Sequence, residues 1–272
     1  CSDVGLFFRS SSSALEILDL SGNITKRREA LPSRALSAAF DPQSSSILIG
    51  TADGSVYRWR YGVDLSSAEV RQGKDLERYI GHPSAVTSLV FHPFGRIFFS
   101  GSLIGELYVW RRYDADSAEG RFDTNILGAG AFVDNSTRIK ASRGHKGDVA
   151  SLSVSNNGEL LAVGDGDGFI EVWKVRGMKL LTSIQAHRGA VFGVSFVGDA
   201  NRLVSIGRDD EVKSWSLEEK VGNDPTLKEF TLKQGLQLFV EGVRGLYRLG
   251  ENSSIVSTQN GDVRVINFGS AA

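Results

Sequence analysis

The sequence predicts an all-β fold in which one short block of strands recurs along the chain. Its four tryptophans, Trp59, Trp110, Trp173 and Trp215, each close a β-forming stretch after a Gly/Asp turn and lie 51, 63 and 42 residues apart. These spacings bracket the ~40–45-residue period of propeller blades once loop insertions are allowed. Apolar residues alternate at period two within the blocks, as in residues 86–91. Small sheets of this kind need both faces covered, which stacking around an axis provides, so we expect a β-propeller.

About six copies of the block follow one another, and they differ in completeness. The first copy, residues 6–18, resembles the second half of a block and closes at Leu18. The four copies that end in tryptophan come next, and the last copy ends with Ile266 at the tryptophan position. We therefore expect about six blades, the first and last incomplete. Residues 1–272 are then a single propeller segment of a longer, possibly tandem-propeller protein that supplies the missing strands.

The most complete copy runs from Ala186-His187 to Trp215. It resembles the WD40 repeat family, whose copies open with Gly-His, continue as strand, turn with Asp and strand, and close with Trp. The resemblance covers nearly the whole chain. It implies a hydrogen-bonded chain of His, Ser or Thr, Asp and Trp in each blade, which satisfies buried polar groups. The full structural polar set is His187, Ser205, Asp209 and Trp215.

The other copies have lost parts of this set, so we expect apolar packing to hold them. Their blade anchors are Trp59, Trp110, Trp173 and Ile266. The Trp173 copy has His145 and Asp167, but Val163 stands at the serine position. The Trp110 copy has His82 and Ser100, but Ile104 stands at the aspartate position. The Trp59 copy keeps only Asp53.

Composition agrees with a folded domain and excludes several classes of protein. With 41% hydrophobic residues, 23% charged residues and a net charge of −1, the chain is neither disordered nor membrane-spanning. One cysteine excludes an internal disulfide framework, and the expected setting is the reducing cytoplasm. The near-neutral charge argues against nucleic acid. The basic runs at 26–28 and 111–112 are interpreted as solvated surface or as part of a patch for an acidic partner.

Patterns for catalysis and for cofactors are missing from the sequence. Residues 165–168 look superficially like a calcium loop, but no bidentate Glu follows at the spacing of an EF-hand. Residues 128–130 lack the third glycine of a dinucleotide-binding turn. Phosphate-loop, zinc-binding and nucleophile-elbow patterns do not occur. We therefore expect no catalytic residue, no cofactor and no metal site, and we predict that the protein is not an enzyme.

Binding through loops and faces remains, and the longest inter-blade insertion, residues 111–137, is the first candidate. Loops of this length within compact domains are usually functional or disordered, and the sequence leaves both open. Four apolar residues would expose apolar surface there unless a partner covers them. A second extended connector is expected at 217–241. The candidate partner-binding residues are Ile126, Leu127, Phe132 and Val133.

The last ninety or so residues allow a narrower comparison. The segments 185–192, 208–210 and 242–247, followed by 255–261, resemble the echinoderm microtubule-associated-protein-like family. There, a blade opening Ala-His-x-Gly precedes one that lacks Gly-His and ends without Trp. The hydrophobic motif that precedes the first propeller of that family is absent here. The resemblance implies a cytoskeletal or axonemal scaffold.

The leading hypothesis is a non-enzymatic protein–protein interaction scaffold, a microtubule-associated or axonemal (ciliary) protein with tubulin or axonemal partners, located in the cytoplasm, cytoskeleton or cilium. It would act as a subunit of a larger assembly without binding nucleic acid or membrane. The alternatives are an adaptor subunit of another multiprotein complex, such as a signalling complex or ubiquitin ligase, and the non-catalytic propeller of a larger enzyme.

Overall fold

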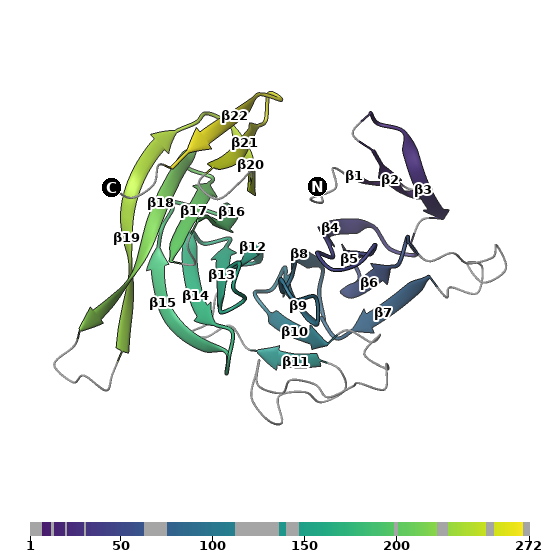
Figure 1. Ribbon diagram of the computed structural model, residues 1–272, viewed down its shortest axis with the longest axis horizontal. Coiled ribbons are helices and arrows are strands. Elements are labelled where there is room, and N and C mark those ends of the chain that lie inside the picture. The colour runs from purple at the N-terminus through teal and green to yellow at the C-terminus, as the bar shows by residue number, and fades with distance from the viewer. Residues whose placement is uncertain are drawn as a thin grey trace. The chain divides into compact units, whose positions relative to one another are not determined.

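The structure is a computed structural model that describes residues 7–11, 14–19, 21–29, 31–62, 75–111, 136–139, 147–198, 201–221, 228–248 and 253–268. Every regular element in these residues is a β-strand, and the strands form six sheets of three or four strands (Figure 1). The all-β class predicted from the sequence is confirmed. A search of the described residues for a helix able to cross a membrane finds none.

The chain divides into two compact units, each with three sheets. The first unit holds β1 to β10 and most of β11, and the second holds β12 to β22. The first unit contains sheet A (β1 Phe7–Ser10, β2 Ala14–Leu18, β3 Ile24–Glu29), sheet B (β4 Ala35–Phe40, β5 Ile47–Thr51, β6 Ser55–Trp59, β7 Leu76–Ile80) and sheet C (β8 Val86–Phe91, β9 Ile97–Ser102, β10 Leu107–Arg111, β11 Ser136–Ile139).

The second unit repeats this plan. Its sheets are sheet D (β12 Val149–Val154, β13 Leu160–Asp165, β14 Phe169–Lys174, β15 Lys179–Gln185), sheet E (β16 Val191–Phe196, β17 Arg202–Gly207, β18 Glu211–Val221, β19 Lys228–Phe239) and sheet F (β20 Val243–Arg248, β21 Ser253–Thr258, β22 Val263–Asn267). Sheets A and F have three strands within the described residues, at the positions where the sequence predicted incomplete copies.

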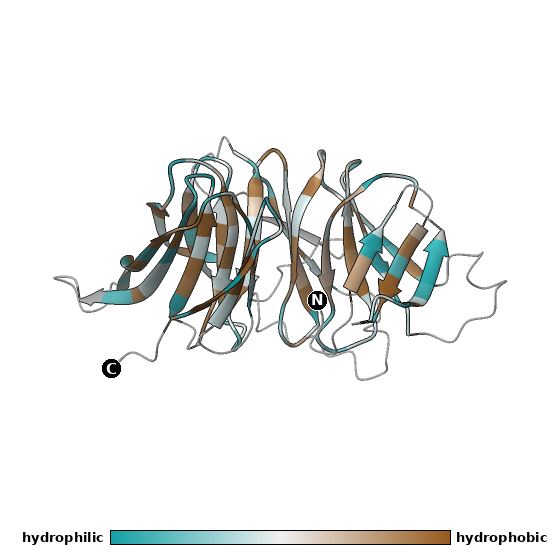
Figure 2. Cartoon of the chain, turned by 90° about the horizontal axis from the view of Figure 1, so that it is seen from above, coloured by the Kyte–Doolittle hydropathy of each residue, from teal (hydrophilic) through white to brown (hydrophobic). Residues whose placement is uncertain are grey.

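In sheets B and C the second and third strands are almost entirely buried, whereas the first strand alternates. All residues of β5, β6 and β9 are buried, while β8 alternates between buried and partly exposed residues. Hydrophobic residues, brown in Figure 2, recur along the strands. Two-sided burial requires a neighbouring sheet on each face, which is the physical reason for the repeat.

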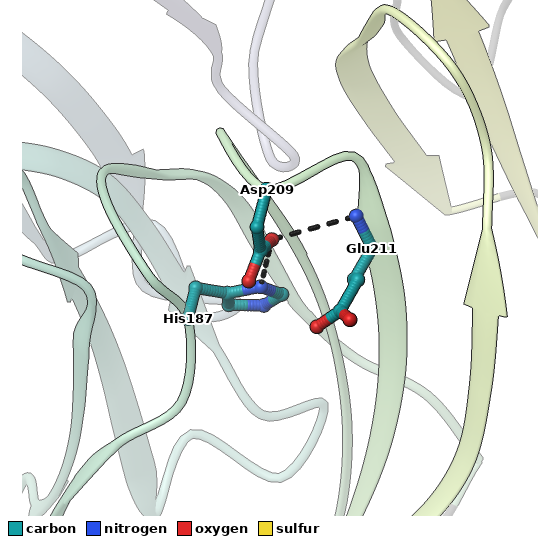
Figure 3. A group of neighbouring side chains, drawn as sticks. All are labelled: His187, Asp209 and Glu211. Carbon is teal, nitrogen blue, oxygen red and sulfur yellow. Dashed lines mark hydrogen bonds and ion pairs between the residues drawn. The ribbon is translucent and has the colours of Figure 1, made fainter.

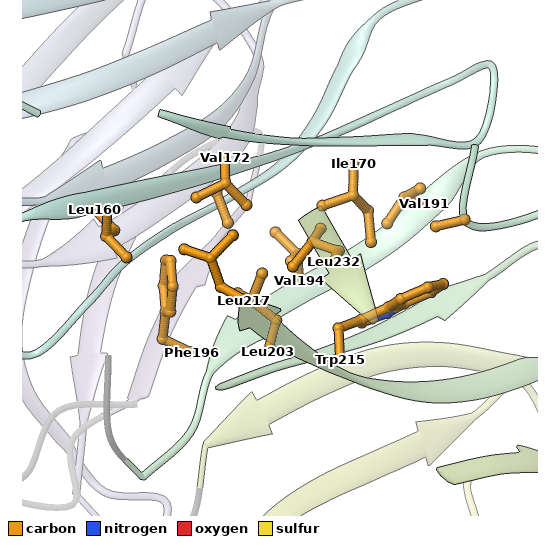
Figure 4. Close-up of a cluster of buried hydrophobic side chains, with 12 residues drawn as sticks. Leu160, Ile170, Val172, Val191, Val194, Phe196, Leu203, Trp215, Leu217 and Leu232 are labelled. Atoms are coloured by element: carbon orange, nitrogen blue, oxygen red, sulfur yellow. The ribbon is translucent and has the colours of Figure 1, made fainter. Parts of the chain in front are cut away.

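Apolar clusters join neighbouring sheets within each unit. In the first unit, one cluster joins sheets A and B around Trp59, and another joins sheets B and C around Trp110. In the second unit, Trp215 and residues of β13, β14 and β16 to β19 form the cluster between sheets D and E (Figure 4). Ile266 belongs to the cluster between sheets E and F. Trp59, Trp110, Trp215 and Ile266 therefore lie in the apolar interfaces between sheets.

The connector expected at residues 217–241 is largely strand. β18 and β19 pair continuously from Glu211 opposite Phe239 to Val221 opposite Lys228, with one register shift. Leu217 lies opposite Leu232, and both side chains are buried in the cluster shared with sheet D. That expectation was wrong because these two apolar residues find a neighbouring sheet to pack against, which a reading of the local sequence does not include.

Candidate functional site

The four residues of the structural polar set lie together in sheet E. His187 is in the β15–β16 loop, Ser205 in β17, Asp209 in the β17–β18 turn and Trp215 in β18. The Nε1–H of Trp215 donates to Ser205 Oγ at 2.9 Å, and Ser205 Oγ lies 2.7 Å from His187 Nε2. His187 Nδ1 lies 2.8 Å from Asp209 Oδ1. One continuous hydrogen-bonded chain therefore crosses the interior of the sheet.

Neutral His187 with its proton on Nδ1 satisfies every link of this chain. Ser205 then donates its hydroxyl to Nε2, and Nδ1–H donates to the Asp209 carboxylate. Burial lowers the pKa of His187 below its ordinary value of 6.5, although the hydrogen bond and charge of Asp209 act in the opposite direction. Burial alone would raise the pKa of Asp209, but the pKa is lowered because Arg188 N–H and His187 donate to its carboxylate. At neutral pH the pair is a neutral imidazole beside a carboxylate.

The order Ser205, His187, Asp209 is the hydrogen-bond order of a serine-hydrolase triad. A nucleophile, however, must reach an electrophilic carbon, and the Ser205 residue is 0% exposed. Its Oγ also accepts the indole N–H of Trp215, which occupies the space beside the oxygen. The cluster therefore acts structurally, satisfying polar groups that hold two loops and two strands in place.

Three potential metal ligands also meet in this cluster. One ligand atom each from His187, Asp209 and Glu211 lies within 4.8 Å of the others, as Figure 3 shows. The ammonium group of Lys213 lies 2.6 Å from Glu211 Oε2 and 3.9 Å from Asp209 Oδ2, and it donates to the Ala186 carbonyl. Because Lys213 already neutralises the carboxylates and both nitrogens of His187 are engaged, this arrangement does not favour a metal ion.

Sheet C contains the same serine-centred half of the set. Ser100 Oγ accepts the Trp110 Nε1–H at 2.6 Å and lies 2.6 Å from His82 Nε2. These three side chains come from β9, β10 and the β7–β8 loop. The geometry is therefore that of sheet E up to the histidine.

At the aspartate position of sheet C, Ile104 is 53% exposed and contributes no carboxylate. The ring of Tyr108 instead stacks on His82, with ring centroids 4.1 Å apart and planes inclined by 27°. The Tyr108 hydroxyl donates to the Gly81 carbonyl at 3.1 Å. An aromatic ring thus orients the histidine where the aspartate is missing, and the sequence reasoning did not anticipate it.

Sheet D satisfies its tryptophan in another way. Val163, at the serine position, is buried, and the Trp173 Nε1–H donates at 3.0 Å to Glu171 Oε2, two residues before it in β14. Asp165 is the buried carboxylate of the β13–β14 turn and accepts the backbone N–H groups of residues 167 and 169. Asp167, predicted to pair with His145, is exposed, and that pairing stays a prediction. His145 lies outside the described residues.

Sheet B keeps Asp53 in its β5–β6 turn. Its carboxylate accepts the Thr51 hydroxyl at 2.5 Å and the Ser55 N–H at 3.2 Å, and it pairs with Arg78 at 3.5 Å. The Asp53 side chain is 39% exposed, in contrast to 9% for Asp209. Asp53 therefore stabilises a local turn without linking the interior of the sheet.

A buried arginine is a second polar feature of sheet B that the sequence did not reveal. Arg58, in β6, is 1% exposed. Its guanidinium donates to Ser46 Oγ and to Glu77, and lies 3.7 Å from Asp41 Oδ2. Two carboxylates balance the buried charge, which would otherwise be very costly.

The first strand of five sheets carries a β-bulge directly after its first paired residue. Bulges of this kind re-aim a side chain and are over-represented next to functional sites. Phe192 and Arg244, both in the second unit, are in direct contact, with the guanidinium 5.1 Å from the ring centroid. The bulged residues, at the same position in β4, β8, β12, β16 and β20, are Leu36, Thr87, Ala150, Phe192 and Arg244.

The candidate partner-binding residues Ile126, Leu127, Phe132 and Val133 lie outside the described residues. Of the predicted insertion, the structure describes its beginning at Arg111 and the first residues of β11. Their role stays a prediction, as does the prediction that residues 1–272 form one propeller segment.

A family model described as "WD domain, G-beta repeat" matches residues 73–111, 136–174 and 178–216. Each match ends one residue after a tryptophan at the third-strand position. Three segments of the chain therefore match the WD40 repeat. The resemblance to the WD40 family is thereby supported, and each matched repeat ends within a sheet that contains the corresponding tryptophan.

Known proteins similar to these WD40 repeats are distant in sequence. The "WD repeat-containing protein 91 homolog" of Dictyostelium discoideum is 23% identical over 190 residues, covering 68% of this chain and 21% of that protein. The "Telomerase protein component 1" of Mus musculus is 27% identical over 135 residues, covering 50% of this chain and 4% of that protein. The chain thus spans about a fifth or less of the length of these relatives.

Among solved structures, the β-propeller domain of Cps50 (Swd1) from Myceliophteria thermophila matches with a TM-score of 0.69 and 11% identity. The match covers 100% of this chain and 82% of that one. At this identity the likeness shows the fold alone, and it confirms the predicted β-propeller class. None of the proteins named here belongs to the echinoderm microtubule-associated-protein-like family.

Proposed function

We propose that this chain is a non-enzymatic scaffold that binds other proteins through the exposed side chains around its first-strand bulges. The observation that carries the proposal is a contrast between the interior of sheet E and the exposed bulge positions of sheets E and F. The cluster with the hydrogen-bond order of a catalytic triad is buried, with Ser205 at 0% exposure. Phe192 and Arg244, re-aimed by bulges, are partly or fully exposed. A substrate therefore cannot reach the buried serine hydroxyl, whereas a partner protein can contact the exposed bulge residues.

The bulged residues differ between sheets, which suits a binding surface. They include an aliphatic residue (Leu36), an aromatic residue (Phe192) and a cation (Arg244). Aromatic residues and arginine are enriched among the residues that dominate protein–protein binding energy. A purely structural role would place similar residues at equivalent positions.

The test is capture of partners from cells by proximity labelling with the full-length protein. The double substitution Phe192→Asp and Arg244→Ala should lose partners that the unchanged protein recovers. The matched control is Leu238→Asp with Val263→Asp, two exposed apolar residues on β19 and β22. If the control loses the same partners, or if neither substitution loses any, the bulge surface is not the binding site.

The narrower form of the proposal is a microtubule-associated or axonemal scaffold in the cytoplasm, cytoskeleton or cilium. It is supported by the sequence resemblance of the last ninety or so residues. Co-sedimentation of the full-length protein with polymerised tubulin tests it. Failure to pellet would contradict the microtubule assignment and leave the scaffold proposal standing.

The second candidate is an adaptor in another multiprotein assembly. Its support is the relative whose name describes a component of telomerase, which matches half of this chain. Proximity labelling that recovers subunits of one such assembly without tubulin would favour this candidate. Recovery of tubulin as the dominant neighbour would exclude it.

A further inference from the structure

Three exposed arginines project from one end of sheets E and F. Arg188 lies in the β15–β16 loop, Arg208 in the β17–β18 turn and Arg244 at the bulge of β20. They come from elements far apart in the sequence, and the first two flank the buried polar set. We name these three residues, Arg188, Arg208 and Arg244, the arginine patch.

Arg188 and Arg208 are neighbours across two loops. The Arg208 N–H donates to the Ala190 carbonyl at 2.9 Å. The Arg208 side chain lies over Gly189, because a Cβ added there would be 3.3 Å from Arg208 Cβ and 3.6 Å from its Cδ. Gly189 has a φ of 149°, and it directly follows Arg188. The two guanidinium-bearing chains therefore begin side by side.

Arg244 joins them through the adjoining loop. The Gly242 N–H donates to Asp210 Oδ1 at 3.0 Å, which ties the β19–β20 loop to the β17–β18 turn. Arg244 lies over the ring of Phe192 and donates to Gln259 Oε1 at 2.9 Å. These contacts hold its guanidinium in one place beside an aromatic surface, which lowers the entropic cost of binding a ligand.

The arginine patch has no carboxylate of its own within the described residues. The arginines that form ion pairs there are Arg9, Arg27, Arg28, Arg58, Arg60 and Arg78, whereas none joins a member of the patch to an acidic side chain.

The carboxylates near the patch bind other groups or lie in the adjoining β19–β20 loop. Asp209 binds His187 and the Arg188 N–H, Asp210 binds the Gly242 N–H, and Glu211 binds Lys213. Glu241 is exposed in the β19–β20 loop, outside any ion pair with the patch. Within the described residues none of these carboxylates forms an ion pair with the patch, and the three arginine side chains are exposed to a ligand.

An acidic border limits the patch on one side. The β13–β14 turn, with exposed Asp167, contacts the β15–β16 loop, where the N–H groups of Ala186 and His187 donate to the Gly168 carbonyl. Negative charge on a ligand is repelled there and attracted at the arginines. A short acidic stretch fits this pattern better than a long polyanion such as a nucleic acid.

We infer that the arginine patch binds a peptide segment of a partner protein that carries two or more closely spaced Asp or Glu residues beside an apolar residue. Each planar guanidinium can bind a carboxylate through two parallel N–H donors. The apolar residue would contact the part of the Phe192 ring that Arg244 leaves open. This inference rests on the proposed function, for which it names the partner chemistry.

The test is selection of a phage-displayed random peptide library on the full chain. The unchanged protein should enrich peptides with adjacent Asp or Glu residues, and the triple substitution Arg188→Ala, Arg208→Ala, Arg244→Ala should abolish that enrichment. The control is Lys174→Ala, Arg176→Ala, Arg264→Ala, which removes the same charge from exposed positions of the second unit. Acidic enrichment that is absent, or that survives the triple substitution, overturns the inference.

Affinities of one selected peptide then separate the possible ligands. Each single arginine substitution should weaken binding about tenfold, and added salt should weaken it further. Tighter binding of a phosphoserine peptide or of a short DNA duplex would assign the patch to phosphate and overturn the inference. In cells, partners that persist with the triple variant contradict the inference alone, whereas an unchanged protein that captures no partner contradicts the proposed function.

Discussion

Sheets C and E solve the same packing problem with different side chains. In both, a serine on the second strand accepts the indole N–H of the tryptophan and contacts the histidine, through Ser100 in sheet C and Ser205 in sheet E. Beyond the histidine they differ: Asp209 binds His187, whereas Tyr108 stacks on His82. The serine contacts are shared because they satisfy the buried tryptophan N–H. The contact on the other side of the histidine only has to orient the imidazole ring, which either residue can do.

This difference shows that either a polar or an aromatic side chain can orient the histidine ring. An aspartate fixes the ring through a directional hydrogen bond and adds charge at the loop. A stacked tyrosine fixes it through contact area and ring electrostatics, without charge. The group that orients the histidine therefore carries a charge in sheet E and none in sheet C.

The largest expected effect comes from removing the shared serine. Ser205→Ala and Ser100→Ala should each lower the free energy of unfolding by about 2–4 kcal/mol, because each leaves a buried tryptophan N–H and a histidine nitrogen without that partner, at about 1–3 kcal/mol per group. Chemical denaturation measures both. Ser195→Ala, at a half-buried position, is the control and should change stability by about 0.5 kcal/mol or less. Clearly unequal losses in the two sheets would break the comparison.

The next effect separates a linking aspartate from a local one. Asp209→Ala should destabilise by about 1–3 kcal/mol more than Asp53→Ala, since it deprives His187 and the Arg188 N–H of their acceptor. Asp53 is more exposed, and water can replace it at its turn. Equal denaturation midpoints for the two variants would refute the distinction.

A smaller effect tests the aromatic version. Tyr108→Phe removes the hydroxyl bond to Gly81 and keeps the stacked ring, whereas Tyr108→Leu removes both. The leucine variant should be less stable than the phenylalanine variant by about 0.5–1.5 kcal/mol. Thermal unfolding of the pair provides the measurement, and equal stability would show that the stack does not orient His82.

The smallest effect is a pH dependence centred on sheet E. The pKa of His187 is lowered in the folded state, so the unfolded chain binds a proton first as the pH falls below 6.5. Stability from this group is complete above that pH and is lost on acidification. His187→Gln should therefore lose less stability than the unchanged protein between about pH 7.5 and about pH 5. Parallel losses in both proteins would mean that His187 titrates with its ordinary pKa.

Local sequence reasoning succeeded where a position follows directly from the repeat. The period-two alternation and the closing tryptophans predicted the strands, and the resemblance to the WD40 repeat predicted which histidine, serine and aspartate belong with Trp215. The connector expected at residues 217–241 was wrong. There, the outcome depends on a neighbouring sheet that covers Leu217.

The sequence by itself determined the all-β class and the repeated blocks, since these depend on side-chain alternation and on a recurring spacing, and its resemblance to the WD40 repeat implied the members of the polar set. Only the tertiary structure decided that Tyr108 stacks on His82 and that Arg244 lies over Phe192. The physical reason is that such contacts depend on strand register, on bulges and on the packing of one sheet against the next, which bring together residues that are distant in the chain.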